Sequence, residues 1–465
     1  MSQKTIFIST GEVSGDLQGA LLIDALKRQA EAIGLNLKIV ALGGEKMAKA
    51  GATLLGNTTG IGSVGLLESL PFVLPTLRIQ RRAKQYLQQH PPDVVVLIDY
   101  MGPNLSIGSF IRRHLSQVPI IYYIAPQDWV WSARSIVPRE TMTIVEMIDQ
   151  LLAVFPEEAR YFEKKGASVT WVGHPLVDRM QSTPTREEAR KRLGIEPEQL
   201  AIALVPASRR QELKYMMPIV FEAARQLQAK LIGNGEDARR LATASLSLSG
   251  MGKTLEDSLP LRYREWGIPN LKIGVRGQGS GVREEDVHSF FVREPRMASN
   301  PKLDTPLFWI PLSLEAYRPT IEAAIQQYGL RATLVAGETQ EVLAAADLAI
   351  AKSGTVNLEL ALLNVPQVVF YRVHPLTYWI AQLLKFSIPF MSPPNLVVMR
   401  SIVPELLQKQ ATPENILQEA LELLFNPERR EQMLADYQEM RELLGDVGVC
   451  DRAAREILQL ASTSK

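Results

Sequence analysis

Cysteine is nearly absent from this sequence, since Cys450 is the only one among 465 residues. A lone cysteine cannot form a disulfide within the chain, and such sparing use of cysteine is typical of the reducing cytosol. The sequence has no run of the roughly 18 apolar residues that a membrane-spanning helix needs. Its opening apolar run is also too short for a secretion signal. We therefore expect a cytoplasmic protein that reaches any lipid substrate from the membrane surface.

An excess of charge of either sign is missing as well. Lysine and arginine together number 51 and aspartate and glutamate 50, so the formal net charge is +1. Such a balance gives no general attraction to nucleic acid, and no nucleic-acid partner is expected. The hydrophobic content of 46% and the charged content of 22% are those of a folded globular protein. The length favours about two or three domains.

Two common cofactor motifs are missing. No Asp-x-Asp occurs in the sequence, so a Mg²⁺ ion that chelates a diphosphate is not expected, and we predict no metal. Gly277, Gly279 and Gly281 are spaced G-x-G-x-G, which is not the dinucleotide-binding G-x-G-x-x-G, and no acidic residue stands where that motif requires one. The sequence therefore predicts no bound cofactor.

Short β-rich runs alternate with amphipathic helical patterns along residues 1–175. This alternation is typical of a doubly wound parallel sheet. The fully apolar run Val94–Ile98 suits a central strand that is covered on both faces. Further strands are expected at Thr5–Ser9, Leu37–Leu42, Ile120–Ile124, Gln150–Phe155 and Val169–Val172, and helices at Leu17–Ala32, Arg78–Gln89 and Glu157–Lys165.

A second alternating series occupies residues 176–465. The turn-rich, charged stretch 174–194 is interpreted as the connection between two lobes, and residues 231–305 as an insertion in the second. Helices at about 427–461 are expected to pack back on the first lobe. The predicted class is therefore α/β, with two Rossmann-like doubly wound lobes facing across a cleft. Strands of the second lobe are expected at Leu200–Val205, Leu307–Ile310, Ala332–Val335, Leu348–Ala351 and Gln367–Tyr371.

The first candidate site is the run STGEVSGD at residues 9–16, between the first strand and the first helix. In a parallel sheet this turn lies at the carboxyl edge, where ligands bind. Carboxylates here would repel a pyrophosphate but can accept hydrogen bonds from sugar hydroxyls. Glu12, Ser14 and Asp16 are therefore candidates for binding an acceptor sugar, the sugar that receives a transferred group. The alternative is a well-capped strand-to-helix turn.

Asp99 comes directly after the apolar strand Val94–Ile98. A carboxylate at the carboxyl end of a central strand is well placed to act as the general base of an inverting glycosyl transfer. Asn104, five residues later, is a candidate acceptor-binding residue. An Asx turn or a helix cap is the alternative reading of Asp99.

Two further candidates follow later strands of the first lobe. Trp129, in the run YYIAPQDWVW, could stack on a sugar or acyl group, although packing in the core is an equal alternative. His174, in the run GHP, lies where the cleft should open and could bind a phosphate. A lone histidine is more often structural.

The second lobe carries two candidate sites for a nucleotide. Ser208 and Arg209 follow a strand and begin a helix, where free N–H groups and a guanidinium favour an anion. The run Ser353-Gly354-Thr355 also begins a helix and can cradle a phosphate. Glu359 lies one helical turn further on, where its carboxylate could accept both hydroxyls of a ribose. For the first site, a solvated basic cap is the alternative.

Two stretches have the composition of lipid-facing surfaces. Residues 64–77 are largely apolar and are followed by Arg78, Arg81, Arg82 and Lys84, so that residues 64–84 combine apolar side chains with cations. Binding to an anionic membrane surface requires both. Residues 376–390, rich in aromatic and leucine side chains, are the second stretch. An ordinary core helix is the alternative for each.

Eight motifs in this order make the chain resemble the lipid-A-disaccharide synthase family of glycosyltransferases. Together they cover nearly the whole chain except the insertion. They are GEVSGD, PDVVVLID, YYIAPQDWVW, VGHPLVD, PASRRQE, AKSGTVNLELAL, VVFYRVHPLTYWIA and PPNL with PELLQ. The chain departs from the family in YMGPN after Asp99, in Ala207, and in the insertion.

The resemblance implies a GT-B fold that joins UDP-2,3-diacylglucosamine to 2,3-diacylglucosamine 1-phosphate (lipid X) with inversion and without a metal. It implies that Asp99 is the base, that Glu12 and Asp16 belong to the acceptor lobe, and that Arg209 and Glu359 bind UDP. Asn395, in the PPNL motif, joins the UDP-binding set. A peripheral contact with the inner membrane and a homodimer are also compatible with it.

Four other functions can be compared with the residues. A UDP-sugar epimerase uses two similar lobes but needs no lipid-facing surface, and a transferase with another acceptor would share the UDP site. A dinucleotide enzyme conflicts with the glycine spacing described above. A non-catalytic homologue that binds a nucleotide sugar or a lipid is favoured only by the altered run after Asp99.

Overall fold

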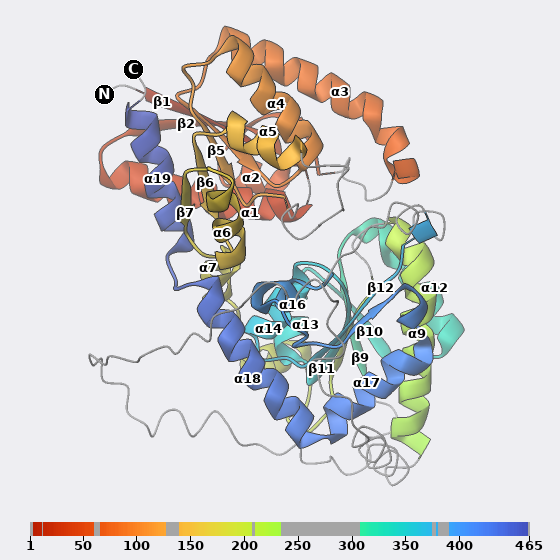
Figure 1. The fold of residues 1–465 in the computed structure, drawn as a ribbon. Coiled ribbons are helices and arrows are strands. Elements are labelled where there is room, and N and C mark those ends of the chain that lie inside the picture. The colour runs from red at the N-terminus through yellow and green to blue at the C-terminus, as the bar shows by residue number, and fades with distance from the viewer. Residues whose placement is uncertain are drawn as a thin grey trace, which may run out of the picture.

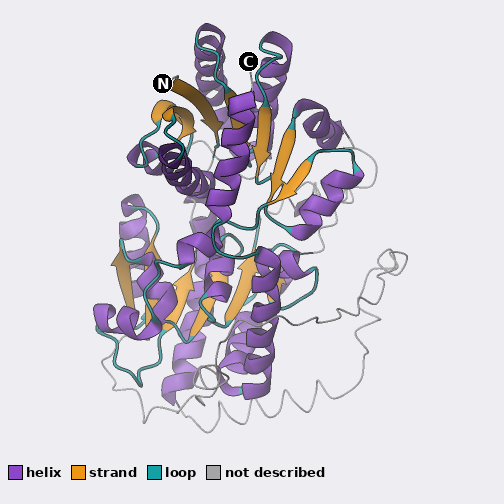
Figure 2. Ribbon diagram, turned by 90° about the vertical axis from the view of Figure 1, so that its left-hand side faces the viewer, coloured by secondary structure: helices purple, strands orange, loops and turns teal. Residues whose placement is uncertain are grey.

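The chain folds into two lobes, each built on its own parallel sheet (Figure 1). A computed structural model describes residues 3–11, 13–59, 66–126, 139–206, 210–233, 307–373, 378–379 and 390–463. Figure 2 shows the two sheets as separate layers of strands with helices on both sides. The predicted α/β class with two doubly wound lobes is confirmed.

The first sheet has seven parallel strands in the order β3-β2-β1-β4-β5-β6-β7. Its central strand β4 is apolar and completely buried, as a strand with helices on both faces must be. The strands are β1 (Gln3–Ser9), β2 (Asn36–Gly43), β3 (Thr53–Asn57), β4 (Val94–Ile98), β5 (Ile120–Tyr123), β6 (Gln150–Ala153) and β7 (Val169–Trp171). The helices between them are α1 (Val13–Ala32), α2 (Glu45–Lys49), α3 (Leu66–Gln89), α4 (Met101–His114), α5 (Arg139–Met147) and α6 (Pro156–Lys164).

The second sheet has six parallel strands in the order β10-β9-β8-β11-β12-β13. They are β8 (Ile202–Val205), β9 (Phe308–Leu312), β10 (Ala332–Ala336), β11 (Leu348–Lys352), β12 (Gln367–Tyr371) and β13 (Glu405–Leu407). The helices of this half include α7 (Leu176–Met180), α8 (Arg186–Leu193), α9 (Arg210–Gly233), α12 (Arg318–Tyr328), α13 (Thr339–Ala345), α14 (Val356–Leu362), α16 (Pro393–Val398), α17 (Pro413–Phe425), α18 (Pro427–Leu444) and α19 (Val449–Thr463), with short 3₁₀ turns at Glu315–Tyr317 and Gln408–Gln410.

The stretch 174–194, interpreted above as the connection between the two lobes, lies between β7 of the first sheet and β8 of the second. It contains α7 and α8, and α8 packs on α13 of the second lobe. Thr185 caps α8 by accepting the N–H of Glu188, whose carboxylate accepts the N–H of Thr185 in return. This reciprocal pair satisfies two N–H groups that a helix start would otherwise leave without partners.

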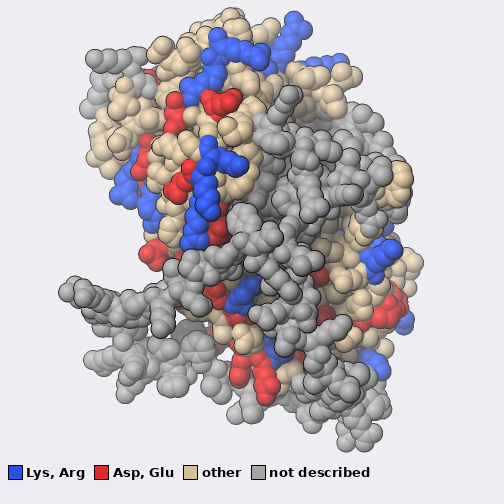
Figure 3. Space-filling view, in the orientation of Figure 1, with Lys and Arg blue, Asp and Glu red and all other residues tan. Residues whose placement is uncertain are grey.

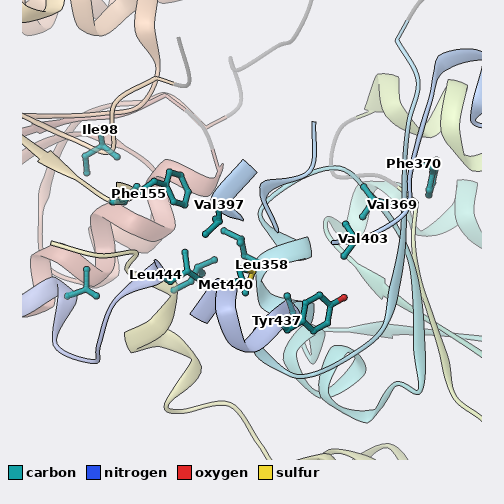
Figure 4. Close-up of a cluster of buried hydrophobic side chains, with 14 of the residues drawn as sticks. Ile98, Phe155, Leu358, Val369, Phe370, Val397, Val403, Tyr437, Met440 and Leu444 are labelled. Atoms are coloured by element: carbon teal, nitrogen blue, oxygen red, sulfur yellow. The ribbon is translucent and has the colours of Figure 1, made fainter. Parts of the chain in front are cut away.

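The C-terminal helices cross from one lobe to the other. In Figure 1 α18 lies along the second lobe and α19 beside the first. The apolar side of α19, with residues such as Ala453, Ala454 and Ile457 buried, packs on α1 and β4. One cluster of buried apolar side chains therefore continues from the first sheet through α19 and α18 into the second. Figure 4 shows part of it, from Ile98 and Phe155 to Leu358 and Tyr437.

Candidate functional site

The turn after β4 holds Asp99 in a rare backbone conformation. Asp99 and Tyr100 have φ angles of 45° and 51°, in the left-handed region that residues with a side chain seldom adopt. The peptide of Asp99 is fixed on both sides: its N–H donates to the carbonyl of Ile124 at 3.0 Å, and its carbonyl accepts from the hydroxyl of Tyr122 at 2.7 Å. The Asp99 side chain is partly exposed, so the turn presents a carboxylate at the carboxyl edge of the first sheet.

Asn104 supports this turn from the interior of the first lobe. Its side chain is completely buried. Its Oδ1 accepts from the Ser9 hydroxyl at 2.7 Å, and its Nδ2 lies 2.6 Å from the carbonyl of Asp99 and 3.0 Å from that of Ile98. These contacts give Asn104 a structural role, and acceptor binding by Asn104 stays a prediction. It ties the ends of β1 and β4 together and so positions Asp99.

Glu158, a buried residue that the sequence analysis did not single out, places a second carboxyl group near Asp99. Glu158 of α6 accepts N–H groups at the ends of two strands: Ala125 at 2.8 Å, Val154 at 2.7 Å and Phe155 at 3.2 Å. Burial raises the pKa of Glu158 to about 7, against the effect of these three hydrogen bonds, and the negative charge of Asp99 raises it slightly further. Its position at the third residue of a helix that begins with Pro156 was the available signal.

In the run 9–16, Asp16 has a structural role. Its buried carboxylate accepts the N–H groups of Gly44 at 2.7 Å and of Lys46 and Met47 at 3.1 Å each, so it caps the start of α2. Both oxygens thus hold this helix start, and the role of Asp16 as a sugar ligand stays a prediction. Ser14 is half-buried in the first turn of α1. Glu12 lies outside the described residues.

The turns after β1 and β4 are in direct contact. A methyl group on Gly11 would lie 1.8 Å from a ring carbon of Tyr100, so only glycine leaves room for that ring. A cavity of about 10 Å³ lies beside this contact, between the two turns and α3. The carboxyl edge of the first sheet therefore brings Gly11 and Asp99 into one region under α3.

His174 is buried at the junction of the lobes. Its Nδ1 accepts the N–H of Leu176 at 3.2 Å, its ring stacks on Phe155 at 5.3 Å, and its backbone N–H donates to the carbonyl of Leu444 at 2.8 Å. Burial lowers the pKa of His174 to about 3, so the ring is neutral at physiological pH. These contacts give His174 a structural role, and phosphate binding by His174 stays a prediction. Trp129 lies outside the described residues.

In the second lobe, the turn after β11 follows a buried ion pair. The Lys352 ammonium group lies 3.1 Å from the Glu212 carboxylate of α9. Ser353 is buried and donates its hydroxyl to the carbonyl of Met391 at 2.7 Å. The N–H of Gly354 donates to Oδ1 of Asn357 at 2.7 Å. Two of the three predicted phosphate-binding residues thus already use a donor group within the protein. Thr355, which begins α14, is half-buried.

Glu359 lies where the two lobes meet. Its Oε1 is 2.6 Å from Nη1 of Arg179 in α7, and its side chain is only 9% exposed. Burial raises the pKa of Glu359, while Arg179 and, less strongly, the Lys46 ammonium group of α2 lower it. The charge of Lys46, which follows β2 of the first lobe, therefore acts on the Glu359 carboxylate of the second. Ser208 and Arg209 lie outside the described residues.

Asn395 organises the loop before β13. Its Oδ1 accepts the N–H groups of Ile402 at 2.8 Å and Val403 at 2.9 Å, and its Nδ2 donates to the Val403 carbonyl and to the Glu405 carboxylate. The side chain is completely buried. All its hydrogen-bonding groups are thus used to hold this loop, and UDP binding by Asn395 stays a prediction.

The outer surface of α3 is apolar along one part and cationic along the next. Val73, Leu74 and Leu77 are 45%, 65% and 56% exposed. The side chains of Arg78, Arg81 and Arg82 that follow are exposed as well, and Lys84 is half-buried. Figure 3 shows cationic side chains along the top of the first lobe, where Figure 1 places α3. For the residues before Val73 in this stretch, and for most of 376–390, no side chains are described.

The described residues contain no group of three or more histidine, cysteine, aspartate or glutamate side chains that could hold a metal ion. None of the helices in the same residues is both long and apolar enough to cross a membrane.

Comparison with known proteins gives consistent matches over almost the full length. The family model for lipid-A-disaccharide synthetase matches residues 6–234 and 281–459, and the unmatched residues between them fall within the predicted insertion. Two relatives named lipid-A-disaccharide synthase are similar: that of Gloeothece citriformis is 53% identical, covering 97% of this chain and 99% of its own, and that of Synechocystis sp. is 48% identical over 98% of each.

A solved structure supports the fold. The S. aureus MnaA complex with UDP aligns over 99% of each chain with a TM-score of 0.56 at 14% identity. At this identity the likeness concerns the two-lobed GT-B architecture alone. The family model and the 53% identical relative go further, and the resemblance inferred from the eight motifs is confirmed. The chain belongs to the lipid-A-disaccharide synthetase family.

Proposed function

We propose that the protein is an inverting glycosyltransferase that moves 2,3-diacylglucosamine from UDP to lipid X and releases UDP. Membership of the family supports this reaction, since relatives 53% and 48% identical over nearly the whole chain carry the name lipid-A-disaccharide synthase. The single observation that carries the chemistry is the strained turn that presents the Asp99 carboxylate at the end of β4.

Asp99 is the general base of this proposal. The acceptor hydroxyl oxygen attacks C1 of the donor sugar from the face opposite UDP, the bond from C1 to the diphosphate oxygen breaks, and the hydroxyl proton passes to the Asp99 carboxylate. A base must be held within hydrogen-bond reach of the proton it takes. The hydrogen bonds that fix the Asp99 peptide from Asn104, Tyr122 and Ile124 provide such rigidity.

The second lobe binds UDP in this proposal. Glu359 accepts hydrogen bonds from the ribose hydroxyls, and Ser208, Arg209 and Thr355 bind the diphosphate. As the C1–O bond breaks, negative charge grows on UDP and must be met by fixed cations and N–H groups. Arg209 serves this need. Lys352, which ends β11 directly before the Ser353 turn and pairs with Glu212, is a further candidate cation.

The acceptor and donor carry acyl chains, so we infer that the enzyme works on the cytoplasmic surface of the inner membrane through α3. The exposed leucines of α3 would enter the interface, and its arginines would meet anionic headgroups. The packing of α3 supports this, since Thr76 and Ile79 of α3 and Tyr100 of the Asp99 turn line the same small cavity. A homodimer stays a prediction of the family resemblance.

The test is to incubate the purified protein with UDP-2,3-diacylglucosamine and lipid X and to look for the disaccharide by mass spectrometry. Asp99→Asn should lower the rate by about a hundredfold to ten-thousandfold, the usual contribution of a general base. The matched control is Asp93→Asn, because Asp93 lies at the opposite end of β4, where it pairs with Lys4. It should keep most of the activity.

The outcomes separate the competing functions. Disaccharide formed equally well by Asp99→Asn would remove Asp99 as the base. UDP released only with a different acceptor would leave the transferase and exclude lipid X. A 2-epimer of the sugar nucleotide would indicate an epimerase, and binding of UDP-sugar without any turnover would indicate the non-catalytic homologue.

A further inference from the structure

Arg179 lies at the junction of the two lobes and contacts Glu359, a residue of the predicted nucleotide site. It belongs to α7, a helix that follows the last strand of the first sheet, and its guanidinium group lies 2.6 Å from Oε1 of Glu359 in α14. The two residues are 180 positions apart in the chain. Sequence patterns gave Arg179 no role, because nothing local to α7 indicates which helix it will meet.

The ion pair between Arg179 and Glu359 is largely buried, and the helix that carries Arg179 is anchored. Both side chains are largely buried, with 20% and 9% of their surfaces exposed, so neither charge can be removed without leaving the other poorly solvated. The neighbouring Asp178 is anchored too, since its carboxylate accepts the N–H groups of Gly448 at 2.6 Å and Cys450 at 2.7 Å. Arg179 is therefore carried by a helix that α19 fixes in position.

Two cations act on the Glu359 carboxylate: Arg179 on α7 and Lys46 on α2. Charged groups on the helices and strands that pack against α14 have other partners. Asp178 contacts α19, Lys352 of β11 pairs with Glu212, Glu341 of α13 pairs with Arg192, and Arg441 of α18 donates to the carbonyls at the far end of α14.

Only one oxygen of Glu359 is used by the ion pair. Among the residues that the structure describes, Oε1 accepts from Arg179 and no donor is found for Oε2. A ribose offers two hydroxyl donors, and a carboxylate whose other oxygen is already fixed can receive them in a single orientation. The guanidinium group is suited to this because its donors are planar and rigid.

We propose that Arg179 is a positioning residue of the nucleotide site, which holds Glu359 by Oε1 so that Oε2 accepts the ribose hydroxyls. The inference rests on the proposed function, in which Glu359 binds the ribose of UDP. It adds a residue from the lobe junction to that site and makes recognition of ribose, as opposed to deoxyribose, depend on α7.

The experiment measures the dissociation constants of UDP and 2′-deoxy-UDP by calorimetry, on the full chain and its variants. The wild-type protein should prefer UDP by about tenfold or more, since a site built to bind a hydroxyl discriminates against its loss. Arg179→Gln should lose most of this preference, with weaker binding of UDP and little change for 2′-deoxy-UDP. Arg179→Lys, which keeps the charge, should recover part of the preference.

The pH dependence gives a second measurement that a merely structural residue would not change. Removing Arg179 removes the larger of the two cationic effects that oppose burial, so the pKa of Glu359 should rise further. In Arg179→Gln, a larger fraction of Glu359 is then protonated as pH falls. The affinity of the variant for UDP should therefore fall more steeply as pH is lowered than that of the wild-type protein.

Arg192→Gln is the matched control. Arg192 also joins two helices by an ion pair, with Glu341, but it is not one of the groups that shift the pKa of Glu359. It should leave both dissociation constants unchanged. Thermal unfolding of each variant establishes that it is folded.

The outcomes distinguish this inference from the proposed function. If Glu359→Gln keeps the wild-type preference for UDP, the ribose role of Glu359 fails, and this inference fails with it. If Glu359→Gln loses the preference while Arg179→Gln keeps it, Arg179 does not position the carboxylate. A lysine variant that behaves like the glutamine variant at every pH would likewise overturn the role given to the charge.

Discussion

At the scale of single residues, buried polar side chains determine the shape of the site more than exposed ones do. Asn104, Asp16 and Asn395 were all candidate ligands, and each uses its hydrogen-bonding groups to hold a turn or a helix start. A motif written in the sequence does not distinguish a residue that touches substrate from one that supports it. Both kinds lie at the carboxyl edge of a parallel sheet, and only the partners separate them.

Glu158 gives a prediction about pH. Its pKa is about 7 in the folded protein, above the ordinary glutamate value of 4.5. A folded-state pKa above the unfolded one means that the folded protein binds the proton more tightly. This stabilisation is complete below about pH 4.5 and is lost as pH rises through 7. One pKa unit corresponds to 1.36 kcal/mol, so the loss is about 3 kcal/mol.

Glu158→Gln is the variant that tests this. An amide resembles the protonated carboxyl group and does not titrate. From pH 5 to pH 8, the free energy of unfolding of the wild-type protein should fall by about 2–3 kcal/mol relative to the variant, as measured by urea unfolding. Glu157→Gln, on the more exposed side of the same helix, is the control. A difference between wild type and Glu158→Gln that is the same at both pH values would contradict the prediction.

At the scale of elements, most strands and helices could be predicted, because their signal is local. β4 and β12 have the predicted bounds. The other predicted strands differ from the observed ones by one or two residues at one or both ends. β3 and β13 were missed. Both are short strands at the edge of a sheet, and β3 contains Gly56, so neither shows the apolar run by which buried strands are found.

Contacts between elements could not be predicted in the same way. Asp16 caps a helix about 30 residues away, and Arg179 meets Glu359 at a distance of 180 positions. Such pairs depend on how the sheets are ordered and how the lobes are joined, which no periodicity records. The site was therefore predictable as a set of strand ends, and its division into supporting and exposed side chains was not.

Helix α3 gives a prediction for membrane binding. The double change Leu74→Gln and Leu77→Gln removes two of its exposed apolar side chains. Binding to vesicles that contain phosphatidylglycerol, measured by co-sedimentation, should fall by about tenfold, since each leucine contributes about a kilocalorie per mole or more when it enters the interface. Binding of the wild-type protein should also weaken with salt, because the arginines act through screened charge.

Leu314→Gln is the control for α3. Leu314 is 49% exposed but belongs to the second lobe, before the 3₁₀ turn Glu315–Tyr317. It should not change vesicle binding. Equal binding by the α3 double variant and the wild-type protein would exclude α3 as the docking surface. A wild-type protein that does not sediment with these vesicles would have the same meaning.

At the scale of the whole molecule, the two lobes are connected twice. The chain passes from β7 into α7, and it returns from α18 to α19 beside the same place. Asp178 links the two passages by accepting the N–H groups of Gly448, Val449 and Cys450, and the Arg452 guanidinium group donates to the carbonyl of Val172. The start of α19 is therefore capped by a residue of the other passage.

Asp178→Ala tests the importance of this link. It should destabilise the protein by about 1–2 kcal/mol, as the loss of a helix cap usually does, and lower the thermal midpoint in calorimetry. Limited proteolysis between α18 and α19 should become faster. The comparison is Asp451→Ala, which removes only the more exposed ion pair with Arg28 and should have little effect. Equal effects of the two changes would mean that Asp178 does not hold α19.

The return of α19 to the first lobe also affects how the protein is made. The apolar face of α1 is covered by a helix whose cap, Asp178, precedes it by 270 residues. Lobes usually fold in the order in which the ribosome produces them. Here the first sheet emerges with one side of its helical layer bare, and that side stays open until the second lobe has been synthesised. Completion of the first lobe is therefore a late event, and a nascent chain with an exposed α1 face is the species that chaperones would meet.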